Sequence, residues 1–318
     1  MRVRLGVLGA GHMGRRHAQK IAQLAESDPG VSLRGVIDID APRAQRLARE
    51  LGARSALALR ELRGQLDAVI VAVPTVAHFE VVRQALRDDL DVLVEKPVAA
   101  TIGEGQEILA LARRGQRVLH VGHVEWFNPA MPILRRYVGA PRYVEAHRLG
   151  PFPSRSLDVD VVRDLMIHDL DILQRLLGEE PDQIEAVGVR VLSDQVDVAN
   201  ARVRFPSGCV ANFTASRVAA TPVRRLRIFQ RDGFLSIDFL AQSAWLARRS
   251  PDPADEAERI LTEELKVDPE DALLSQLRSF VEAVRLRKVD CPSAGEALGA
   301  LRTALRVVEA MPSVLELS

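Results

Sequence analysis

A glycine-rich segment near the start of the chain has the spacing of a phosphate-binding loop. Gly9-Ala-Gly-His-Met-Gly14 matches G-x-G-x-x-G, follows a short apolar run and opens a segment with helical periodicity. Gly9 would permit a tight turn, Gly11 would let the backbone approach a pyrophosphate, and Gly14 would allow a helix to pack closely on a strand. The amides of His12 and Met13 would then point at phosphate oxygens at the positive end of that helix. A glycine-rich turn without a ligand has the same spacing.

An acidic residue ends the second apolar run, residues 31–37. Asp38 stands near the position at which a carboxylate accepts hydrogen bonds from the adenosine ribose of a dinucleotide. A carboxylate there repels a 2′-phosphate, and the next two residues, Ile39 and Asp40, bring no arginine. We therefore expect NAD, with NADP less favoured. Arg43, one turn further on, would lie over the adenine or in solvent.

A lysine follows the predicted strand at residues 91–94, within Glu95-Lys96-Pro97. Ligands of open α/β sheets bind at the carboxyl ends of the strands, so Lys96 would stand beside the nicotinamide end of a bound cofactor. A partly desolvated lysine there is suited to exchange a proton with a substrate hydroxyl. Taken by itself, Lys96 would more simply be a solvated surface lysine.

A second candidate for proton transfer lies on a helix predicted at about Val161–Leu177. Asp164, His168 and Asp171 are spaced i, i+4 and i+7, which places them on one helical face. Asp164 could then orient the imidazole of His168. An ordinary pair of residues on a helix surface would have the same spacing.

The other histidines and the two cysteines give no sign of a metal site. These histidines are His12, His17, His78, His120, His123 and His147. None of them pairs at HExxH spacing, and Cys209 and Cys291 are too far apart for a C-x-x-C motif. We expect no metal and no disulfide framework, with His17 packed on the first helix and His78 lining the cofactor crevice or starting a helix.

The candidate site residues are positioned by two halves of the chain that differ in their pattern of apolar residues. Short apolar runs alternate with helical stretches over about the first 120 residues, which predicts a doubly wound parallel sheet. The runs are residues 3–8, 31–37, 67–74, 91–94 and 117–121, with helices near 13–26, 42–51, 77–87 and 103–114. The second half favours a largely antiparallel sheet, with the single helix that contains His168 and two C-terminal helices at 273–287 and 294–311. Its predicted strands are 142–149, 184–192, 198–205, 209–217, 223–230 and 234–238.

The composition excludes several classes of protein. The chain has 318 residues, 47% of them hydrophobic, and its 43 basic and 43 acidic residues cancel. A neutral chain lacks the positive field of a nucleic-acid binder, and no apolar run approaches the roughly 20 residues needed to cross a bilayer. The first residues do not form a signal peptide. We expect a cytoplasmic protein with no nucleic-acid or membrane partner.

Four segments together resemble the Gfo/Idh/MocA family of nicotinamide-dependent oxidoreductases. They are Gly9–Gly14, Val73-Pro-Thr-Val-Ala-His78, Glu95-Lys96-Pro97 and Val121-Gly122, and the resemblance covers essentially the whole chain. It implies a dinucleotide-binding Rossmann domain at 1–122. It also implies a domain at 123–318 that binds substrate, assembles subunits and contains an open antiparallel sheet with C-terminal helices. The chain departs from the family pattern at Val73, Thr75 and Trp126, where Thr, Asn and Arg are common.

The resemblance also implies roles for individual residues. Pro74, Thr75, His78 and Glu95 would line the cofactor site beside the glycine loop and Asp38. Lys96 and His168 would handle the hydroxyl proton, with Asp164 orienting His168, and either of the two could be the base.

The substrate would be a small molecule with an oxidisable ring hydroxyl. Family members mostly act on a sugar, an inositol or a sugar nucleotide. Arg148, Arg155 and Arg163 gather in sequence around the predicted helix and could bind a diphosphate. The stretches His147–Asp160 and Asn200–Asn212 resemble a subgroup of UDP-N-acetylglucosamine 3-dehydrogenases. Lys96, Arg155, Asp164 and His168 would contact such a substrate, and oxidation at C3 of UDP-N-acetylglucosamine is the leading hypothesis.

Two other functions are compatible with this pattern. One is an NADP-dependent reductase of a different carbonyl compound. The other is a catalytically silent regulator that senses NAD, although the presence of Lys96, Asp164 and His168 argues against it.

The second domain is also expected to associate. One helix layer covers one face of a sheet, so the other face would be open. We expect Val210, Phe213, Val223, Leu226 and Ile228 on that face. An exposed apolar sheet usually marks an association surface, and the family resemblance likewise implies a homodimer or homotetramer.

Overall fold

The computed structural model describes residues 2–152, 159–250, 260–288, 292–312 and 315–316. The chain forms two compact units, one of Met1–Val124 with Asp271–Leu298 and one of Glu125–Glu270 with Gly299–Ser318. The sequence placed the division at residues 122 and 123. The structure divides the chain two residues later and adds a late helical segment to the first unit.

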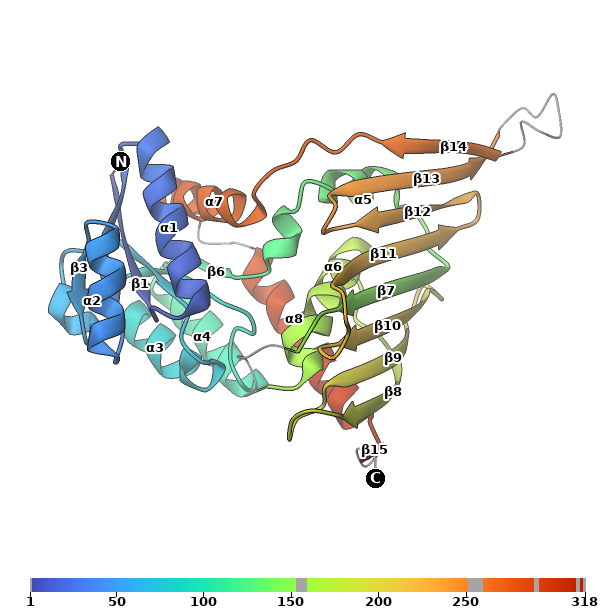
Figure 1. Cartoon of the computed structure of the whole chain (residues 1–318), viewed down its shortest axis with the longest axis horizontal. Coiled ribbons are helices and arrows are strands. Elements are labelled where there is room, and N and C mark those ends of the chain that lie inside the picture. Colours follow the sequence, from blue (N-terminus) through green and yellow to red (C-terminus); the bar gives the residue numbers. More distant parts are fainter. Residues whose placement is uncertain (1, 153–158, 251–259, 289–291, 313–314, 317–318) are drawn as a thin grey trace. The chain divides into compact units, whose positions relative to one another are not determined.

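The first unit is a doubly wound parallel sheet, as the alternating pattern predicted (Figure 1). Its strands are β1 (Val3–Leu8), β2 (Val31–Ile37), β3 (Arg54–Ala56), β4 (Ala68–Val71), β5 (Asp91–Val94) and β6 (Leu119–Val121). Its helices are α1 (His12–Ser27), α2 (Ala41–Glu50), η1 (Leu59–Leu62), α3 (Thr75–Arg87), α4 (Ile102–Arg114) and α7 (Ala272–Leu286). The strand order β3-β2-β1-β4-β5-β6 reverses direction between β1 and β4. Ligands of such sheets bind at this reversal.

Helix α7 belongs to the first unit because of its apolar face. Leu277, Phe280 and Val284 are buried in one core with Val3 and Leu5 of β1. The helix follows the strands of the second unit in the sequence, so local patterning could not assign it to this core.

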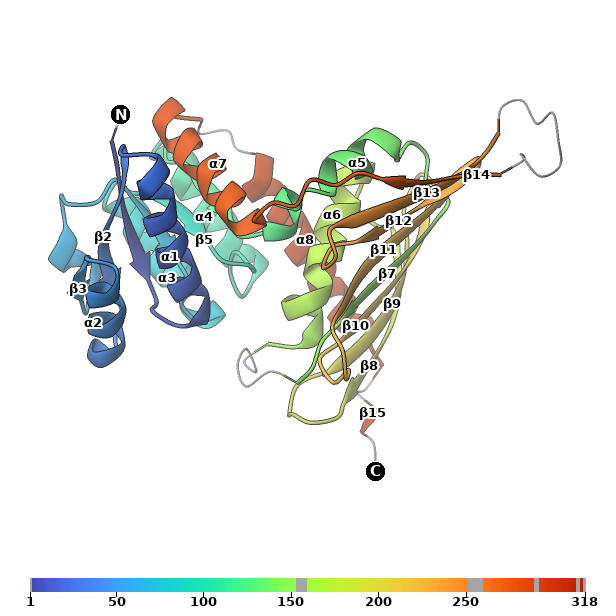
Figure 2. The ribbon, with the colours of Figure 1, turned by 45° about the horizontal axis from the view of Figure 1, so that its top comes forward.

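The second unit is built on a mostly antiparallel sheet (Figures 1 and 2). Its strands are β7 (Tyr143–Leu149), β8 (Gln183–Arg190), β9 (Val198–Arg204), β10 (Val210–Ser216), β11 (Val223–Gln230), β12 (Gly233–Asp238), β13 (Ser243–Arg249), β14 (Ile260–Leu265) and β15 (Leu315–Glu316). They lie in the order β14-β13-β12-β11-β7-β10-β9-β8-β15, and β7–β10 and β8–β15 are the parallel pairs. The sequence predicted the first six of these strands. Strand β14 was missed because five of its six residues are exposed, which leaves no apolar alternation to detect.

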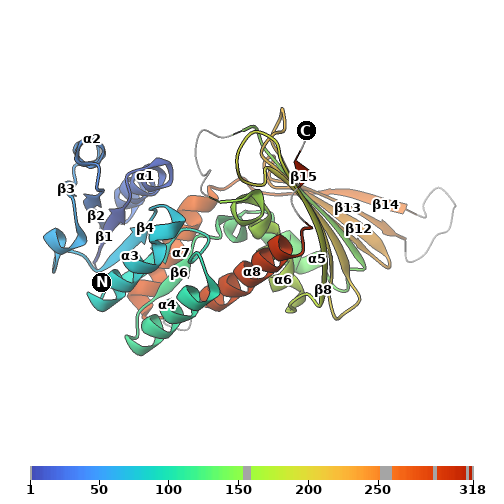
Figure 3. The same ribbon diagram turned by 90° about the horizontal axis from the view of Figure 1, so that it is seen from below.

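Helices cover one face of this sheet (Figure 3). They are η2 (Val124–Phe127), α5 (Met131–Tyr137), η3 (Val162–Met166), α6 (Ile167–Leu177) and the second half of α8 (Pro292–Glu309). In the part of the chain that the structure describes, no helix is long and apolar enough to cross a membrane.

The predicted residues of the uncovered face were partly wrong. Phe213, Leu226 and Ile228 are at most 1% exposed and pack into the core beneath the helices. Val210 and Val223 point to the other side, because positions three residues apart on a strand face opposite ways. The expected list therefore mixed the two faces.

The uncovered face instead has a row of aromatic rings across four adjacent strands. Tyr143, Phe229, Phe234 and Trp245 follow one another with centroid separations of 5.6, 5.3 and 5.0 Å. The Arg227 guanidinium lies 5.4 Å from the Phe229 centroid and 5.8 Å from that of Phe234. Charged residues flank this aromatic row, so the face is amphipathic and not uniformly apolar.

A buried histidine makes the first unit sensitive to acid. His120 on β6 is 5% exposed, its ring contacts Phe280, and its Nε2 has no hydrogen-bond partner among the described residues. Burial lowers the pKa of His120 from 6.5 to about 4. The imidazole is therefore neutral at neutral pH in the folded protein.

This depressed pKa predicts a loss of stability between pH 6.5 and pH 4. Over that range the unfolded chain binds the proton and the folded chain does not, so stability falls as the pH falls, by about 3 kcal/mol in total. Denaturant titrations at pH 7 and pH 4.5 should show this loss, and His120→Leu should reduce it. His147→Leu is the control, because His147 is exposed on β7. An unchanged pH dependence in His120→Leu would contradict the prediction.

Candidate active site

The glycine loop brings helix α1 unusually close to strand β1. Gly9 has φ +94°, and a Cβ there would lie 2.5 Å from the Ala72 carbonyl oxygen. A Cβ on Gly14 would overlap the carbonyl oxygen of Gly9. A side chain at Gly14 would push α1 away from β1, and one at Gly9 would clash with the backbone that follows β4.

The beginning of α1 has the features of a pyrophosphate site. A Cβ on Gly11 would meet no protein atom within 4 Å, so the backbone faces open space there. The helix begins at His12 with no side-chain cap at Gly11 and no acidic residue in its first turn. The N–H groups of this turn, with the helix dipole, are suited to an anion. His12 is exposed and Met13 is partly exposed.

Asp38 lies against this loop at the end of β2. Its Oδ2 accepts a hydrogen bond from the Ala10 amide at 2.6 Å, and its Oδ1 accepts one from the Asp40 amide at 2.9 Å. Arg43 lies within 3.7 Å of the same carboxylate. Ile39, which is 95% exposed, stands next to Asp38. The loop and Asp38 thus fit the pyrophosphate and ribose of a dinucleotide.

Glu95, at the end of β5, is bound by His17, which the sequence predicted to pack on the first helix without predicting this contact. His17 on α1 is fully buried, and its Nε2 lies 2.6 Å from Oε1 of Glu95. Burial by itself would raise the pKa of Glu95, but the His17 hydrogen bond and the charges of His17, Lys96 and His78 lower it overall. Glu95 is therefore a buried carboxylate directly beside Lys96, which is partly exposed. The feature of the sequence that could have indicated this contact is the position of His17, one turn after Gly14 on the same helix.

The loop after β4 is tied to the loop after β5. His78 is 1% exposed; its Nδ1 lies 2.7 Å from the Pro97 carbonyl oxygen and its Nε2 3.0 Å from that of Val73. Its ring is therefore placed to brace the two loops. Pro74 and Thr75, at the start of α3, are exposed and partly exposed. A direct cofactor contact of these residues stays a prediction.

The helix with Asp164 and His168 is interrupted by a wider turn. Residues Val162–Met166 form a π-helical turn, and the α-helix follows from Ile167. Such turns are frequent at functional sites. Asp164 and His168 are partly exposed, whereas Asp171 is 1% exposed and forms an ion pair with Arg175 at 2.9 Å. Asp171 therefore does not share their accessible face.

The predicted group of phosphate-binding arginines is not supported. Arg148 is 2% exposed, and its guanidinium binds Asp169 and Glu125. These charges outweigh desolvation and raise the pKa of Arg148. Arg163 binds Asp160 through Nε at 2.6 Å. Arg155 lies outside the described residues, so its role stays a prediction.

The described residues contain no group of three or more His, Cys, Asp or Glu side chains that could hold a metal ion.

Comparison with known proteins identifies the family. Residues 3–123 match the model of an oxidoreductase family with an NAD-binding Rossmann fold, and residues 133–236 match the GFO/IDH/MocA C-terminal domain. The chain is 38% identical over 317 residues to UDP-N-acetylglucosamine 3-dehydrogenase of Acidithiobacillus ferrooxidans, covering 99% of each chain. It is 30% identical over 243 residues to scyllo-inositol 2-dehydrogenase (NAD(+)) of Bacillus subtilis, covering 68% of each.

A solved structure of the Acidithiobacillus ferrooxidans dehydrogenase aligns with a TM-score of 0.90 over 98% of both chains, at 38% identity. The fold, the glycine loop and both family models all indicate the same family, and the two models together cover most of the sequence. The chain belongs to the Gfo/Idh/MocA family of oxidoreductases, and its cofactor is NAD.

Proposed function

We propose that this oxidoreductase is a UDP-N-acetylglucosamine 3-dehydrogenase, which oxidises the C3 hydroxyl of the sugar ring. The observation on which the substrate depends is the full-length similarity to a dehydrogenase of that name, at 38% identity and a TM-score of 0.90. NAD, when bound, supplies the acceptor for the hydride that leaves the substrate carbon. Gly9, Gly11, Gly14 and Asp38 would hold it.

The protein's own task in this reaction is to remove the hydroxyl proton. Lys96 follows a buried carboxylate at the end of β5, and His168 is partly exposed on its helix with Asp164 in the preceding turn. Both are groups that accept a proton near neutral pH when suitably placed. We propose that these two residues handle the proton, with Asp164 orienting His168 and Arg155 contacting the substrate.

A substrate panel tests the proposed function directly. UDP-N-acetylglucosamine should reduce NAD at least a hundredfold more efficiently than free N-acetylglucosamine or scyllo-inositol, followed by absorbance of the reduced cofactor. Borodeuteride reduction of the product should place deuterium at C3. Faster oxidation of the inositol, or deuterium at another carbon, would contradict the proposal.

Lys96→Ala should abolish turnover while the Kd for NAD changes by less than about tenfold, because the lysine acts on the reacting hydroxyl. His168→Ala, assayed in parallel, shows whether the histidine is also needed. Lys266→Ala is the matched control, since Lys266 is 84% exposed and pairs with Asp268. Wild-type turnover in Lys96→Ala would remove this lysine from the mechanism.

Asp38 should determine the preference for NAD over NADP. The wild-type protein should bind NAD more tightly than NADP, and Asp38→Asn should narrow the difference by about tenfold. The substitution removes the repulsion and leaves Arg43, whose Nη1 lies 3.7 Å from Oδ2 of Asp38, in place. Isothermal titration with both cofactors measures the change. A lower Kd for NADP in the wild-type protein would refute the assignment.

We also propose that a second copy of the chain covers the aromatic row on the open sheet. Tyr143, Phe229, Phe234 and Trp245 offer large apolar rings beside paired charges such as Arg227 and Glu145, which suits a symmetric interface. The dimer or tetramer expected from the sequence would form in this way. That the protein is cytoplasmic stays a prediction.

Light scattering at micromolar concentration should give a multiple of 35.0 kDa. Trp245→Asp should shift the mass toward the monomer, because it places a charge in the aromatic row. Leu57→Asp is the control, since Leu57 is exposed and belongs to the first unit. A wild-type mass near 35 kDa at every concentration would exclude the dimer.

A further inference from the structure

We propose that Arg148 and Arg217 are positioning residues for the reaction, because they fix the helical segment that contains Asp164 and His168. Neither side chain is placed to reach solvent, at 2% and 1% exposure. The inference rests on the proposed role of His168 in proton transfer. It gives a function to two buried cations that the chemistry itself does not use.

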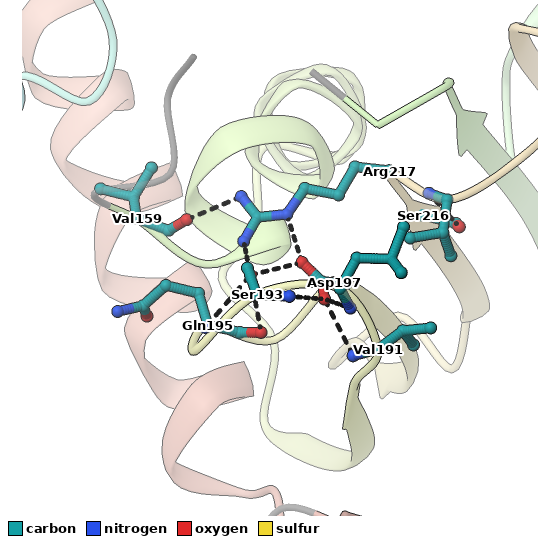
Figure 4. A network of polar contacts seen from close by, with 9 residues as sticks. Val159, Val191, Ser193, Gln195, Asp197, Ser216 and Arg217 are labelled. Carbon is teal, nitrogen blue, oxygen red and sulfur yellow. Dashed lines mark hydrogen bonds and ion pairs between the residues drawn. The ribbon is translucent and has the colours of Figure 1, made fainter. Parts of the chain in front are cut away.

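Arg217 fixes the approach to this segment (Figure 4). Its Nε donates to Oδ1 of Asp197 at 2.7 Å, its Nη2 donates to Oγ of Ser193 at 3.0 Å, and its Nη1 donates to the Val159 carbonyl oxygen at 3.0 Å. The Asp197 carboxylate is itself fixed, because its Oδ2 accepts hydrogen bonds from the amides of Val191, Leu192 and Ser193. The guanidinium therefore joins the Val159 backbone to a rigid loop between β8 and β9.

Two further hydrogen bonds connect this contact to the start of the helix. The Val161 amide donates to the Val196 carbonyl oxygen at 2.9 Å, one residue before Asp197. Oδ1 of Asp160 accepts a hydrogen bond from the Arg163 amide at 2.9 Å. The three residues that precede the π-helical turn are thus each held by a specific contact.

Arg148 fixes the same segment one turn after Asp164. From β7, its Nε and Nη2 donate to the two carboxylate oxygens of Asp169 at 2.9 and 2.8 Å. Its Nη1 donates to Oε1 of Glu125 at 2.8 Å. Asp169 follows His168 directly on α6. A two-point contact of this kind fixes the rotation of the helix about its own axis, which sets the direction of the neighbouring imidazole.

The π-helical turn explains why such fixation is needed. A π turn is a rare irregularity whose hydrogen bonds span five residues instead of four, so the helix on its two sides does not follow one regular screw. Asp164 lies within this turn and His168 lies just beyond it. Buried ion pairs add little net stability over apolar contacts. Their directional hydrogen bonds, however, define how the two ends of the turn lie relative to the strands.

The test compares arginine with lysine at both positions. Arg148→Lys and Arg217→Lys keep the charge and lose the planar fork. Each should lower kcat at least about tenfold while the KM for NAD stays within about twofold, because a displacement near 1 Å of a reacting group has effects of this size. The isotope effect on kcat with C3-deuterated substrate should rise, since the chemical step becomes slower.

Arg285→Lys is the matched control. Arg285 makes a two-point pair of the same geometry with Asp28 at 2.6 and 2.9 Å, but this pair belongs to the first unit and is partly exposed. It should lose thermal stability and keep both kcat and the isotope effect. If Arg148→Lys and Arg217→Lys behave in the same way as this control, the proposal is wrong.

Two further comparisons keep the outcome clear. Asp169→Asn and Asp197→Asn preserve side-chain shape and should repeat the kinetic effect if the lysine variants do not fold. A failure of all four to fold would assign both arginines to the fold alone and overturn the proposal. Full activity in His168→Ala would instead refute the proposed role of His168, whatever the arginine variants do.

Discussion

The close contact between α1 and β1 at Gly14 is the constraint on which the nucleotide-binding unit depends. Because Gly14 has no side chain, the helix can lie directly on the Gly9 carbonyl oxygen. This contact directs the first turn of α1 toward the position of the pyrophosphate. It also brings His17, one turn later, within 2.6 Å of Glu95 at the end of β5. A single backbone contact thus fixes both the phosphate site and the carboxylate beside Lys96.

In the second unit, a buried ion pair fixes the position of the helix that contains His168. This helix, α6, is buried on most of its surface, and apolar packing alone would not select its rotation. Arg148 and Asp169 form a fully buried, two-point ion pair from β7 to this helix. Burying these charges is costly unless every donor and acceptor is paired, so only one arrangement of strand and helix satisfies them.

Local patterns predicted what depends on neighbouring residues. The apolar runs gave all but one strand of the parallel sheet, and the glycine spacing gave the loop between β1 and α1. The three-residue strand β3 and the exposed strand β14 have too little apolar alternation to be recognised. The face assigned to Phe213 and Leu226 was wrong because the two-residue period was not followed along each strand. The assignment of α7 to the first core depends on contacts with residues about 270 positions earlier, which no local pattern contains.

The arginines show a related limit. A guanidinium looks the same in a sequence whether it binds a phosphate or a buried carboxylate, so Arg148 and Arg163 were grouped as ligands for a diphosphate. The structure pairs each with a carboxylate of its own unit, Asp169 and Asp160. Arg148 and Asp169 lie 21 positions apart, so their proximity follows from the fold and only the structure shows it. Arg163 and Asp160 lie three residues apart, so their pairing is local and could have been recognised from the spacing.

The two candidate proton-handling residues share a local arrangement. Lys96 directly follows Glu95, and His168 directly precedes Asp169. Each of these carboxylates is buried and is bound by a buried side chain from another element. His17 binds Glu95, and Arg148 binds Asp169. A carboxylate fixed in this way holds the backbone of its neighbour, while the neighbouring side chain stays partly exposed. The two units therefore combine a rigid backbone with an accessible side chain by the same physical means, although one is a parallel sheet and the other is mostly antiparallel.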